Sequence, residues 1–287
     1  MRQTRVWANK TIAVIILIRP INCLSASIGV LIGGYINSRI GNTELWLASL
    51  IAGIITAFGN ITNDYFDIEI DRINKPYRIL PSEKLSSQHA LRIGIVLSLV
   101  AILLGFYLGW LMGLVALLMV VMAFLYSWKL KKSFLIGNII ISLMTALTFF
   151  YGTLLNGKIG HAWIPALIVL FFMFAREILK TVEDIPGDAR VGARTIAILW
   201  GKSRALSTFA IFAIIVAFMI PIPWVIQDVS LIYLILTVPF VSIALLLVVI
   251  WVKKLPSDEA IKKSLIITKG SWIIWAVAMC LGLWLRV

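Results

Sequence analysis

Long runs of apolar residues, separated by short polar segments, dominate the pattern of this chain. A membrane-spanning helix needs about 20 mainly apolar residues. The runs of this kind predict nine spans, at residues 11–37, 45–63, 92–109, 111–128, 134–155, 162–180, 204–222, 231–252 and 266–286. The pattern therefore indicates an all-α, polytopic membrane protein that forms a single domain over residues 1–287.

The composition narrows the class of protein further. Hydrophobic residues make up 61% of the chain and charged residues 14%, with a mean hydropathy of +1.00. Soluble domains usually contain about 45–50% apolar and about 25% charged residues. The two cysteines, Cys23 and Cys280, lie in apolar runs and form no CxxC motif. These features exclude an ordinary soluble enzyme, a disulfide scaffold and a zinc or iron–sulfur cluster.

The basic residues predict the orientation of the chain. Of the 26 Lys and Arg residues, 23 fall on the side that carries the N-terminus, and Arg39, Lys158 and Arg286 fall on the other side. Cytoplasmic loops are enriched in Lys and Arg, so we expect a cell-membrane protein with its N-terminus in the cytoplasm and its C-terminus outside. The net charge of +13 then reflects topology and not a nucleic-acid partner. Nothing in the sequence indicates an obligate protein partner.

The acidic residues are concentrated in two clusters. Eight of the 13 Asp and Glu residues belong to them, and each cluster lies at the predicted cytoplasmic end of a span. In the first cluster, Asn63, Asp67 and Asp71 share one helix face if the preceding helix continues, and Asp64 joins that face. Like charges at this spacing repel each other. Bound Mg²⁺ would offset the repulsion, because it prefers oxygen ligands.

The second cluster repeats the spacing, with Asp184 and Asp188 four residues apart after a predicted span. Pro186 predicts that the helix ends near Ile185, because the residue before a proline is biased away from the helical conformation. Asp188 is then expected on a turn. Basic residues follow both clusters, so we expect two carboxylate sets ringed by cations at one membrane surface. This arrangement suits a diphosphate bridged by Mg²⁺.

A diphosphate site at the surface of a bilayer indicates an allylic prenyl diphosphate as the substrate. Metal ions would neutralise the departing pyrophosphate, an apolar cavity would keep water from the carbocation, and aromatic side chains would stabilise it. A transporter for phosphate-like anions is the alternative from another class, since acids in spans often mark transport paths. It is disfavoured because the acids lie at span ends on one side only.

The same residues resemble the signatures of the UbiA-type intramembrane prenyltransferase family. Segment 63–76 (NDYFDIEIDRINKP) is similar to the first family motif, and segment 184–188 (DIPGD) is similar to the second. Segment 126–131 (YSWKLK) resembles the Tyr/Lys segment of the family, and segment 19–22 (RPIN) resembles its N-terminal segment. The similarity extends over essentially the whole chain.

This resemblance implies nine helices in a ring around a central cavity, capped by cytoplasmic loops at about 63–91 and 177–203. It implies a Mg²⁺ site formed by Asn63, Asp67, Asp71, Asp184 and Asp188, in which the aspartates are also catalytic. It implies further catalytic contacts to the leaving group from Tyr126, Lys129 and Lys131. The expected substrate-binding residues are Arg19, Asn22, Asn63, Asp64, Arg72, Lys75, Arg78, Lys180 and Arg194.

Within the family, segments 176–180, 183–188 and 192–195 look most like the archaeal ether-lipid branch. Members of that branch transfer a geranylgeranyl group from its diphosphate to geranylgeranylglyceryl phosphate and release pyrophosphate. The resemblance thus implies a prenyl diphosphate donor, a lipid-like acceptor and membrane lipids as partners. An aromatic acceptor of the 4-hydroxybenzoate type, as in quinone biosynthesis, stays open as an alternative, because both reactions use the same diphosphate site. The general base is open between pyrophosphate and an acid such as Asp64.

Overall fold

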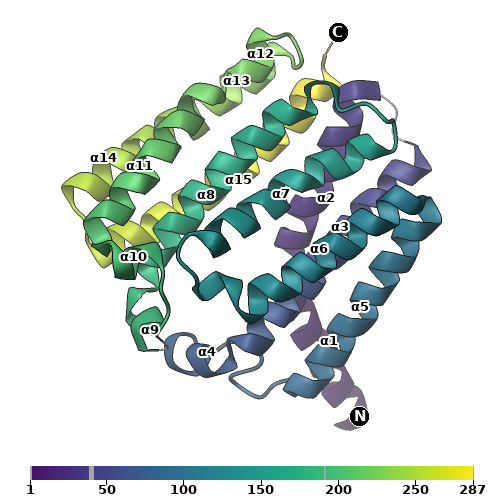
Figure 1. The fold of residues 1–287 in the computed structure, drawn as a ribbon, viewed down its shortest axis with the longest axis vertical. Coiled ribbons are helices and arrows are strands. Elements are labelled where there is room, and N and C mark those ends of the chain that lie inside the picture. Colours follow the sequence, from purple (N-terminus) through teal and green to yellow (C-terminus); the bar gives the residue numbers. More distant parts are fainter. Residues whose placement is uncertain (1, 39–41, 191, 287) are drawn as a thin grey trace. The chain divides into compact units, whose positions relative to one another are not determined.

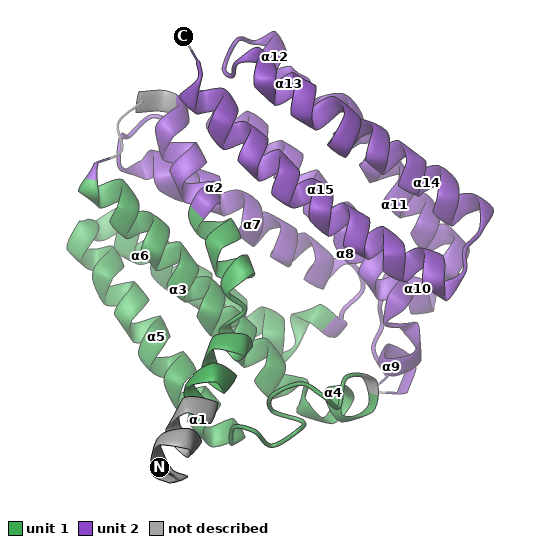
Figure 2. Cartoon of the chain, turned by 180° about the vertical axis from the view of Figure 1, so that it is seen from behind, with its two compact units in different colours: residues 1–27, 43–131 green, residues 28–42, 132–287 purple. Residues whose placement is uncertain are grey.

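The computed structural model describes residues 2–38, 42–190 and 192–286, which form helices and connecting segments and contain no strand (Figure 1). Arg39, one of the expected external cations, lies outside these residues. The chain divides into two compact units, one made of residues 1–27 and 43–131 and the other of residues 28–42 and 132–287 (Figure 2).

The first unit is built around one long buried helix. Its elements are α1 (Arg2–Ile18), the beginning of α2 (Pro20–Ser38), α3 (Thr43–Phe66), α4 (Ile68–Asn74), α5 (Ser87–Leu108), α6 (Trp110–Trp128) and the start of η1 (Leu130–Lys132). α3 packs against α1, α5 and α6. A single residue, Gly109, separates α5 from α6, and its φ of 151° is accessible to glycine at no steric cost. The chain can therefore reverse between two spans without a loop.

The second unit contains the remaining helices. They are the rest of α2, α7 (Ile136–Leu154), η2 (Gly160–Ala162), α8 (Trp163–Glu183), α9 (Ile185–Arg190), α10 (Ile196–Leu199), α11 (Gly201–Met219), α12 (Ile222–Val225), α13 (Leu231–Thr237), the π-helical η3 (Val238–Ile243), α14 (Ala244–Lys254) and α15 (Asp258–Trp284). α8 packs against α7 and α11, and α15 packs against α13 and α14.

Close backbone contact joins α2 to α7 within the second unit. A methyl group added at Gly33 would lie 1.9 Å from the carbonyl oxygen of Phe149, and one added at Gly152 would lie 2.1 Å from that of Val30. Small residues at helix interfaces are typical of membrane proteins, where they let backbones approach each other. Glycine at these two positions is therefore a packing requirement.

The structure confirms the all-α, multi-pass prediction. In the described residues, eight helices are long and apolar enough to span a membrane, and the pair α1–α2 gives a ninth if its 45° bend is one broken span. The single span expected at 11–37 is thus two helices. Pro20 disfavours the right-handed helical conformation at Arg19, which lies between the two helices, and Arg19 adopts a left-handed conformation with φ 52°.

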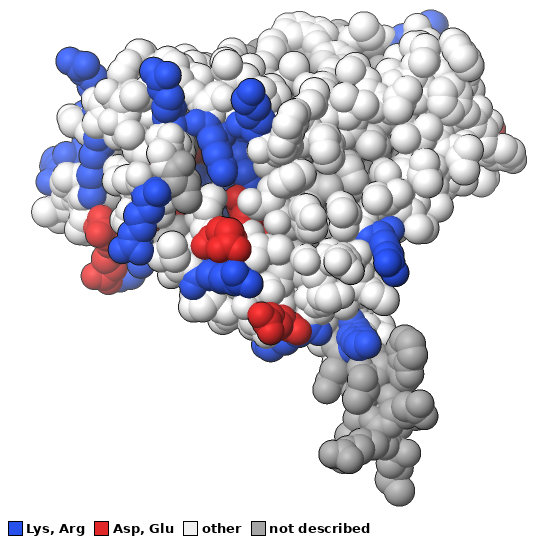
Figure 3. All heavy atoms as spheres, turned by 60° about the horizontal axis from the view of Figure 1, so that its bottom comes forward, with Lys and Arg blue, Asp and Glu red and all other residues white. Residues whose placement is uncertain are grey.

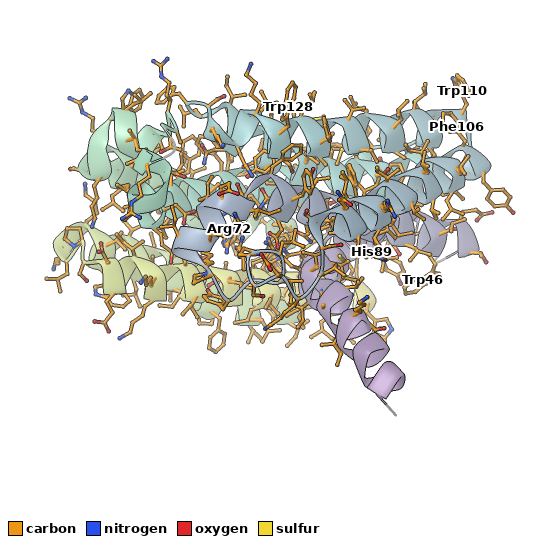
Figure 4. All side chains as sticks on the ribbon, turned by 90° about the horizontal axis from the view of Figure 1, so that it is seen from below. Trp46, Arg72, His89, Phe106, Trp110 and Trp128 are labelled. Atoms are coloured by element: carbon orange, nitrogen blue, oxygen red, sulfur yellow. The ribbon has the colours of Figure 1, made fainter. Side chains whose placement is uncertain are left out.

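Exposed tryptophans mark the ends of spans in the first unit. Trp46 at the start of α3 and Trp110 at the start of α6 are exposed, as is Trp128 at the end of α6. Figure 4 shows Trp46 and Trp110, with Phe106, toward one end of the helices and Trp128 away from it. Tryptophan is enriched where a bilayer meets water, so these positions agree with spans that begin and end there.

Candidate active site

The first acid motif lies where a long helix is followed by a short one. α3 ends at Phe66, α4 begins at Ile68, and Asp67 between them has φ −98° and ψ 3°. The Asp67 amide still donates to the Asn63 carbonyl (3.1 Å), and the Asp71 amide donates to the Asp67 carbonyl (2.7 Å). The expected helix therefore ends one residue before Asp67, but the hydrogen-bond spacing that relates the three polar residues is kept.

The break between α1 and α2 brings Arg19 to this motif, where its guanidinium group pairs with Asp64. The Asn22 backbone amide donates to the Arg19 carbonyl (2.9 Å). In a regular helix it would donate to the Ile18 carbonyl, four residues earlier. The Asn60 side chain donates to the Ile18 carbonyl instead (2.8 Å). Asn60 was not among the expected site residues, although it lies four residues before Asp64 on the same helix, and that spacing could have identified it.

Arg78 binds the two most buried carboxylates of the motif. Its guanidinium group lies 2.5 Å from Asp71 and 3.3 Å from Asp64, whose side chains are only 6% and 7% exposed. Burial alone would lower the pKa of the Arg78 guanidinium, but the two carboxylates outweigh burial and raise that pKa above its ordinary value. Arg78 therefore stays charged and, with Arg19, offsets the repulsion between Asp64 and Asp71.

Lys131 forms an ion pair with Asp67, the remaining aspartate of the first motif. Its ammonium group lies 2.6 Å from Asp67 Oδ1 and 3.1 Å from Asn63 Oδ1, and its side chain is 12% exposed. Lys129, directly after the end of α6, is exposed. Tyr126 is half-buried on the last turn of α6. The sequence left Lys129 and Lys131 as equal candidates, and the structure brings Lys131 to the motif.

Other expected residues of the first unit lie at its margin. Arg72 forms an exposed ion pair with Glu69 (2.9 Å) and is not brought to the buried carboxylates. Lys75 is half-buried in the segment after α4. The side-chain amide of Asn22 donates to Asn60 at 3.5 Å, so it contacts the motif through that residue.

The second acid motif has the same backbone arrangement as the first. α8 ends at Glu183, α9 begins at Ile185, and Asp184 between them has φ −86° and ψ 0°. The Asp184 amide donates to the Lys180 carbonyl (3.0 Å), and the Asp188 amide donates to the Asp184 carbonyl (2.9 Å). Both motifs therefore place one aspartate at a one-residue break and a second aspartate four residues later, on the short helix that follows.

The expected helix end near Ile185 is confirmed, but the expected turn at Asp188 is wrong. Asp188 lies on the short helix α9. Pro186 is in the first turn of that helix, where a backbone N–H has no helical partner and proline is tolerated. The proline thus starts a new helix after the break and does not end helical structure.

Charged residues around the second motif differ in their surroundings. Glu177, on α8, is buried and pairs with Arg176 (3.4 Å) and Lys180 (3.7 Å). Arg194, after α9, is exposed, and its backbone amide donates to the carbonyl of Lys132 (2.9 Å). Figure 3 shows Lys and Arg side chains close to Asp and Glu side chains on the surface, beside uncharged areas.

The donor set of the first motif fits Mg²⁺. Among the residues that the structure describes, no three Asp, Glu, His or Cys side chains converge on one point. The side-chain oxygens of Asn63 and Asp67 nevertheless share one cation, the Lys131 ammonium. Hard amide and carboxylate oxygens of this kind are the ligands that Mg²⁺ prefers. Asn63 and Asp67 are therefore among the residues that would hold the metal in the first unit.

Comparison with known proteins identifies the family. The model of the UbiA prenyltransferase family matches residues 23–273, which include both acid motifs. The chain belongs to the UbiA prenyltransferase family. The expected family and the expected class of enzyme, a multi-pass membrane prenyltransferase, are thereby confirmed.

Individual UbiA proteins resemble the chain over most of its length. The digeranylgeranylglyceryl phosphate synthase of Methanosphaera stadtmanae is 36% identical over 222 residues, which cover 77% of this chain and 81% of that protein. A structure solved in a study of digeranylgeranylglyceryl phosphate synthase in membranes is 30% identical, with a TM-score of 0.75, and the match covers 96% of this chain and 98% of that one. A UbiA homologue from Archaeoglobus fulgidus, solved with GPP and Mg²⁺, is 16% identical, with a TM-score of 0.67, over 93% of this chain and 99% of that one. This last similarity shows the shared fold.

Proposed function

We propose that the protein is a digeranylgeranylglyceryl phosphate synthase. It transfers a geranylgeranyl group from geranylgeranyl diphosphate to geranylgeranylglyceryl phosphate and releases pyrophosphate, in archaeal ether-lipid synthesis. The observation that carries this proposal is the 36% identity to the Methanosphaera stadtmanae enzyme over 77% of this chain and 81% of that protein. The 30% identical solved structure supports it over nearly the full length of both chains.

The two acid motifs bind the Mg²⁺ and the diphosphate head in this proposal. Asn63, Asp67 and Asp71 contribute from the first unit, and Asp184 and Asp188 contribute from the second, so that residues 1–287 act as one catalytic domain. Mg²⁺ neutralises charge on the pyrophosphate when it is bound. The Mg²⁺ and GPP in the Archaeoglobus fulgidus homologue support this assignment of metal and donor chemistry.

Lys131, Arg78 and Arg19 are the proposed phosphate contacts of the first motif. Each now pairs with an aspartate, and a bound diphosphate would offer these cations a second anionic partner. The bond between C1 of the prenyl chain and the bridging oxygen breaks, and its electron pair leaves with the pyrophosphate. The acceptor hydroxyl oxygen then forms the ether bond to C1, and its proton passes to the pyrophosphate. We leave Asp64 out of proton transfer because its carboxylate already pairs with two guanidinium groups.

The proposed site lies on the cytoplasmic face. The support is the excess of Lys and Arg on one side of the predicted spans, which also directs the N-terminus to the cytoplasm and the C-terminus to the outside. Both substrates then meet the enzyme at the inner surface of the cell membrane, with their prenyl chains in the bilayer.

An acceptor screen tests the proposal. The purified protein in detergent is given geranylgeranyl diphosphate and Mg²⁺ with either geranylgeranylglyceryl phosphate or 4-hydroxybenzoate, and products are identified by mass. The expected result is the digeranylgeranyl ether with the lipid acceptor and no prenylated aromatic acid. Prenylation of the aromatic acid alone would overturn the proposed acceptor. Uptake of a phosphate anion into liposomes without any pyrophosphate release would overturn the enzyme assignment.

A further inference from the structure

A hollow of about 540 Å³ opens on the surface of the second unit, apart from the acid motifs themselves. Two chain segments line it. The first is the connection from η1 into α7, with Lys132, Ser133 and Phe134, and the second includes Arg194 and Trp200 on either side of α10. None of the five acidic site residues lines this hollow, and Lys132, Ser133 and Trp200 have no role in the proposed diphosphate site.

Backbone hydrogen bonds hold the two segments together next to the second acid motif. The Arg194 amide donates to the Lys132 carbonyl (2.9 Å), and the Ala193 amide donates to the Asp188 carbonyl (3.0 Å). The position of Arg194 is thereby fixed relative to α9, which carries Asp188. A molecule bound in the hollow would therefore lie beside a segment that carries a proposed metal ligand.

Two basic side chains, Lys132 and Arg194, line the hollow, and no acidic side chain of the described residues lines it. Among the described residues, neither the Lys132 side chain nor the Arg194 side chain forms an ion pair. Two cations that line one concavity repel each other, unless an anion lies between them. Ser133 adds a hydroxyl donor.

The start of α7 adds a second electropositive feature to the same place. Leu135 precedes the helix in the left-handed conformation (φ 54°) and provides no side-chain cap. No side chain caps the first turn of this 19-residue helix. Ile136 in that turn lines the hollow, and its own amide donates to the Phe134 carbonyl (2.6 Å). Uncapped helix N-termini favour phosphate groups.

The rim of the hollow is apolar and aromatic. The rings of Phe134 and Trp200 lie 4.9 Å apart between centroids. Ile136, Leu199 and Trp200 are each exposed by nearly half, at 49%, 45% and 46%. A free phosphate ion would gain nothing from this rim, whereas the carbon chain of an amphiphilic phosphate would cover it. The chemistry of the hollow thus favours a phosphate monoester attached to a lipid chain.

We propose that this hollow binds the phosphate of the lipid acceptor. Lys132, Ser133 and Arg194 hold the phosphate group, and the glyceryl ether chain passes over Phe134 and Trp200. This inference rests on the proposed function, because geranylgeranylglyceryl phosphate is the phosphate-bearing acceptor. It assigns the acceptor phosphate and the donor diphosphate to different cations, so the two substrates can be bound at the same time.

Steady-state kinetics of Lys132→Gln and Arg194→Gln test the assignment. Each variant should raise the KM for geranylgeranylglyceryl phosphate about tenfold or more, as expected for loss of a charge-assisted hydrogen bond. The KM for geranylgeranyl diphosphate and the kcat should stay within about twofold, because the donor contacts and the chemical step are untouched. Arg190→Gln, which removes an exposed arginine of α9 that does not line the hollow, is the matched control and should behave as wild type. An unchanged acceptor KM in both variants would overturn the inference.

A binding measurement without the donor separates this inference from the proposed function. Trp200 should report ligand binding as a change in fluorescence that is absent in Trp200→Phe. We expect saturation by geranylgeranylglyceryl phosphate in detergent, weaker binding of glycerol phosphate, and loss of both signals in the Lys132→Gln/Arg194→Gln variant. Equal affinity for inorganic phosphate and for the lipid phosphate would overturn the lipid assignment. If Trp200 responds to the lipid phosphate but the protein transfers no prenyl group to it, binding in the hollow is supported and the proposed function is contradicted. If the protein transfers the prenyl group without any Trp200 response, the proposed function is supported and binding in the hollow is contradicted.

Discussion

Replacing Lys131 by alanine tests whether its ammonium group acts on the diphosphate. The side chain makes two close polar contacts, at 2.6 Å to Asp67 and 3.1 Å to Asn63, and is nearly buried. A hydrogen bond to a charged group contributes about 1.5–3 kcal/mol, so losing one such contact to the departing pyrophosphate predicts a fall in kcat/KM for the donor of about 10-fold to 150-fold. The measurement is the initial rate of pyrophosphate release against geranylgeranyl diphosphate, at saturating acceptor and Mg²⁺.

Lys129→Ala provides the comparison, because it removes the same charge from an exposed position two residues away. Its loss of activity should be no more than about threefold, as for exposed charges in general. The Mg²⁺ concentration for half-maximal rate should not rise in Lys131→Ala, whereas it should rise in Asp67→Asn, which weakens a proposed ligand. Equal losses in the two lysine variants would refute a specific contact and would indicate a diffuse electrostatic effect.

Three further predictions follow from the geometry. Asp67→Ala and Asp184→Ala should each abolish turnover while size-exclusion chromatography still shows folded protein, and wild-type turnover in either variant would remove that residue from the site. Excess EDTA should stop pyrophosphate release and added Mg²⁺ should restore it, whereas unaltered release under chelation would contradict a metal-dependent reaction. Gly33→Ala should lower the midpoint of thermal unfolding in detergent, because its methyl group would lie 1.9 Å from the Phe149 carbonyl oxygen and overpacking costs about 1–3 kcal/mol. Gly270→Ala is its control, because the added methyl group would meet open space beyond its own helix backbone, and equal midpoints for the two variants would contradict the packing argument.

Apolar runs predicted the spans well, but they underestimated the length of several helices. The last span was expected at 266–286, yet α15 begins at Asp258. Ser257 accepts a hydrogen bond from the Ala260 amide, and two acids occupy the first turn, so the helix starts in a polar segment that hydropathy does not register. Ser86 starts α5 in the same way, by accepting from the His89 amide. Capping signals were thus available in the sequence and mark helix ends more closely than apolar runs do.

Spacing along the chain predicted the acids of the first motif but not their partners. The sequence predicted both Arg72 and Arg78 as substrate-binding residues and did not distinguish between them. In the structure, of these two arginines only Arg78 contacts Asp64 and Asp71. The reason is the turn after α4, which begins at Lys75 and returns the chain toward α3. Arg72 lies on α4 itself and faces Glu69. Contacts that depend on the path of a loop cannot be deduced from helical periodicity.

In the sequence, only Pro20 indicated the break between α1 and α2. The break affects the proposed site, because it determines the backbone conformation of Arg19. A continuous helix would have left the Arg19 backbone regular, whereas the observed φ of 52° is costly for a residue with a side chain. Two interactions stabilise it: the Asn60 side chain satisfies the Ile18 carbonyl, and the guanidinium group pairs with buried Asp64. The strain therefore occurs at a position where the side chain contributes charge to the proposed site.

The two acid motifs have different sequences but share the same one-residue break between a long helix and a short one. Asp67 (φ −98°, ψ 3°) and Asp184 (φ −86°, ψ 0°) both adopt the sparsely populated bridge conformation, in which active-site residues are often found. In each case the residue joins a long apolar helix to a short polar one, and hydrogen bonds to residues four positions away persist on both sides. A regular helix would have stacked the carboxylates along a single line, where they repel each other. The break interrupts the regular helix at the first aspartate of each pair while the local hydrogen bonds are retained. The break recurs in two units, with Pro186 in one motif and without a proline in the other, which supports equivalent roles for Asp67 and Asp184.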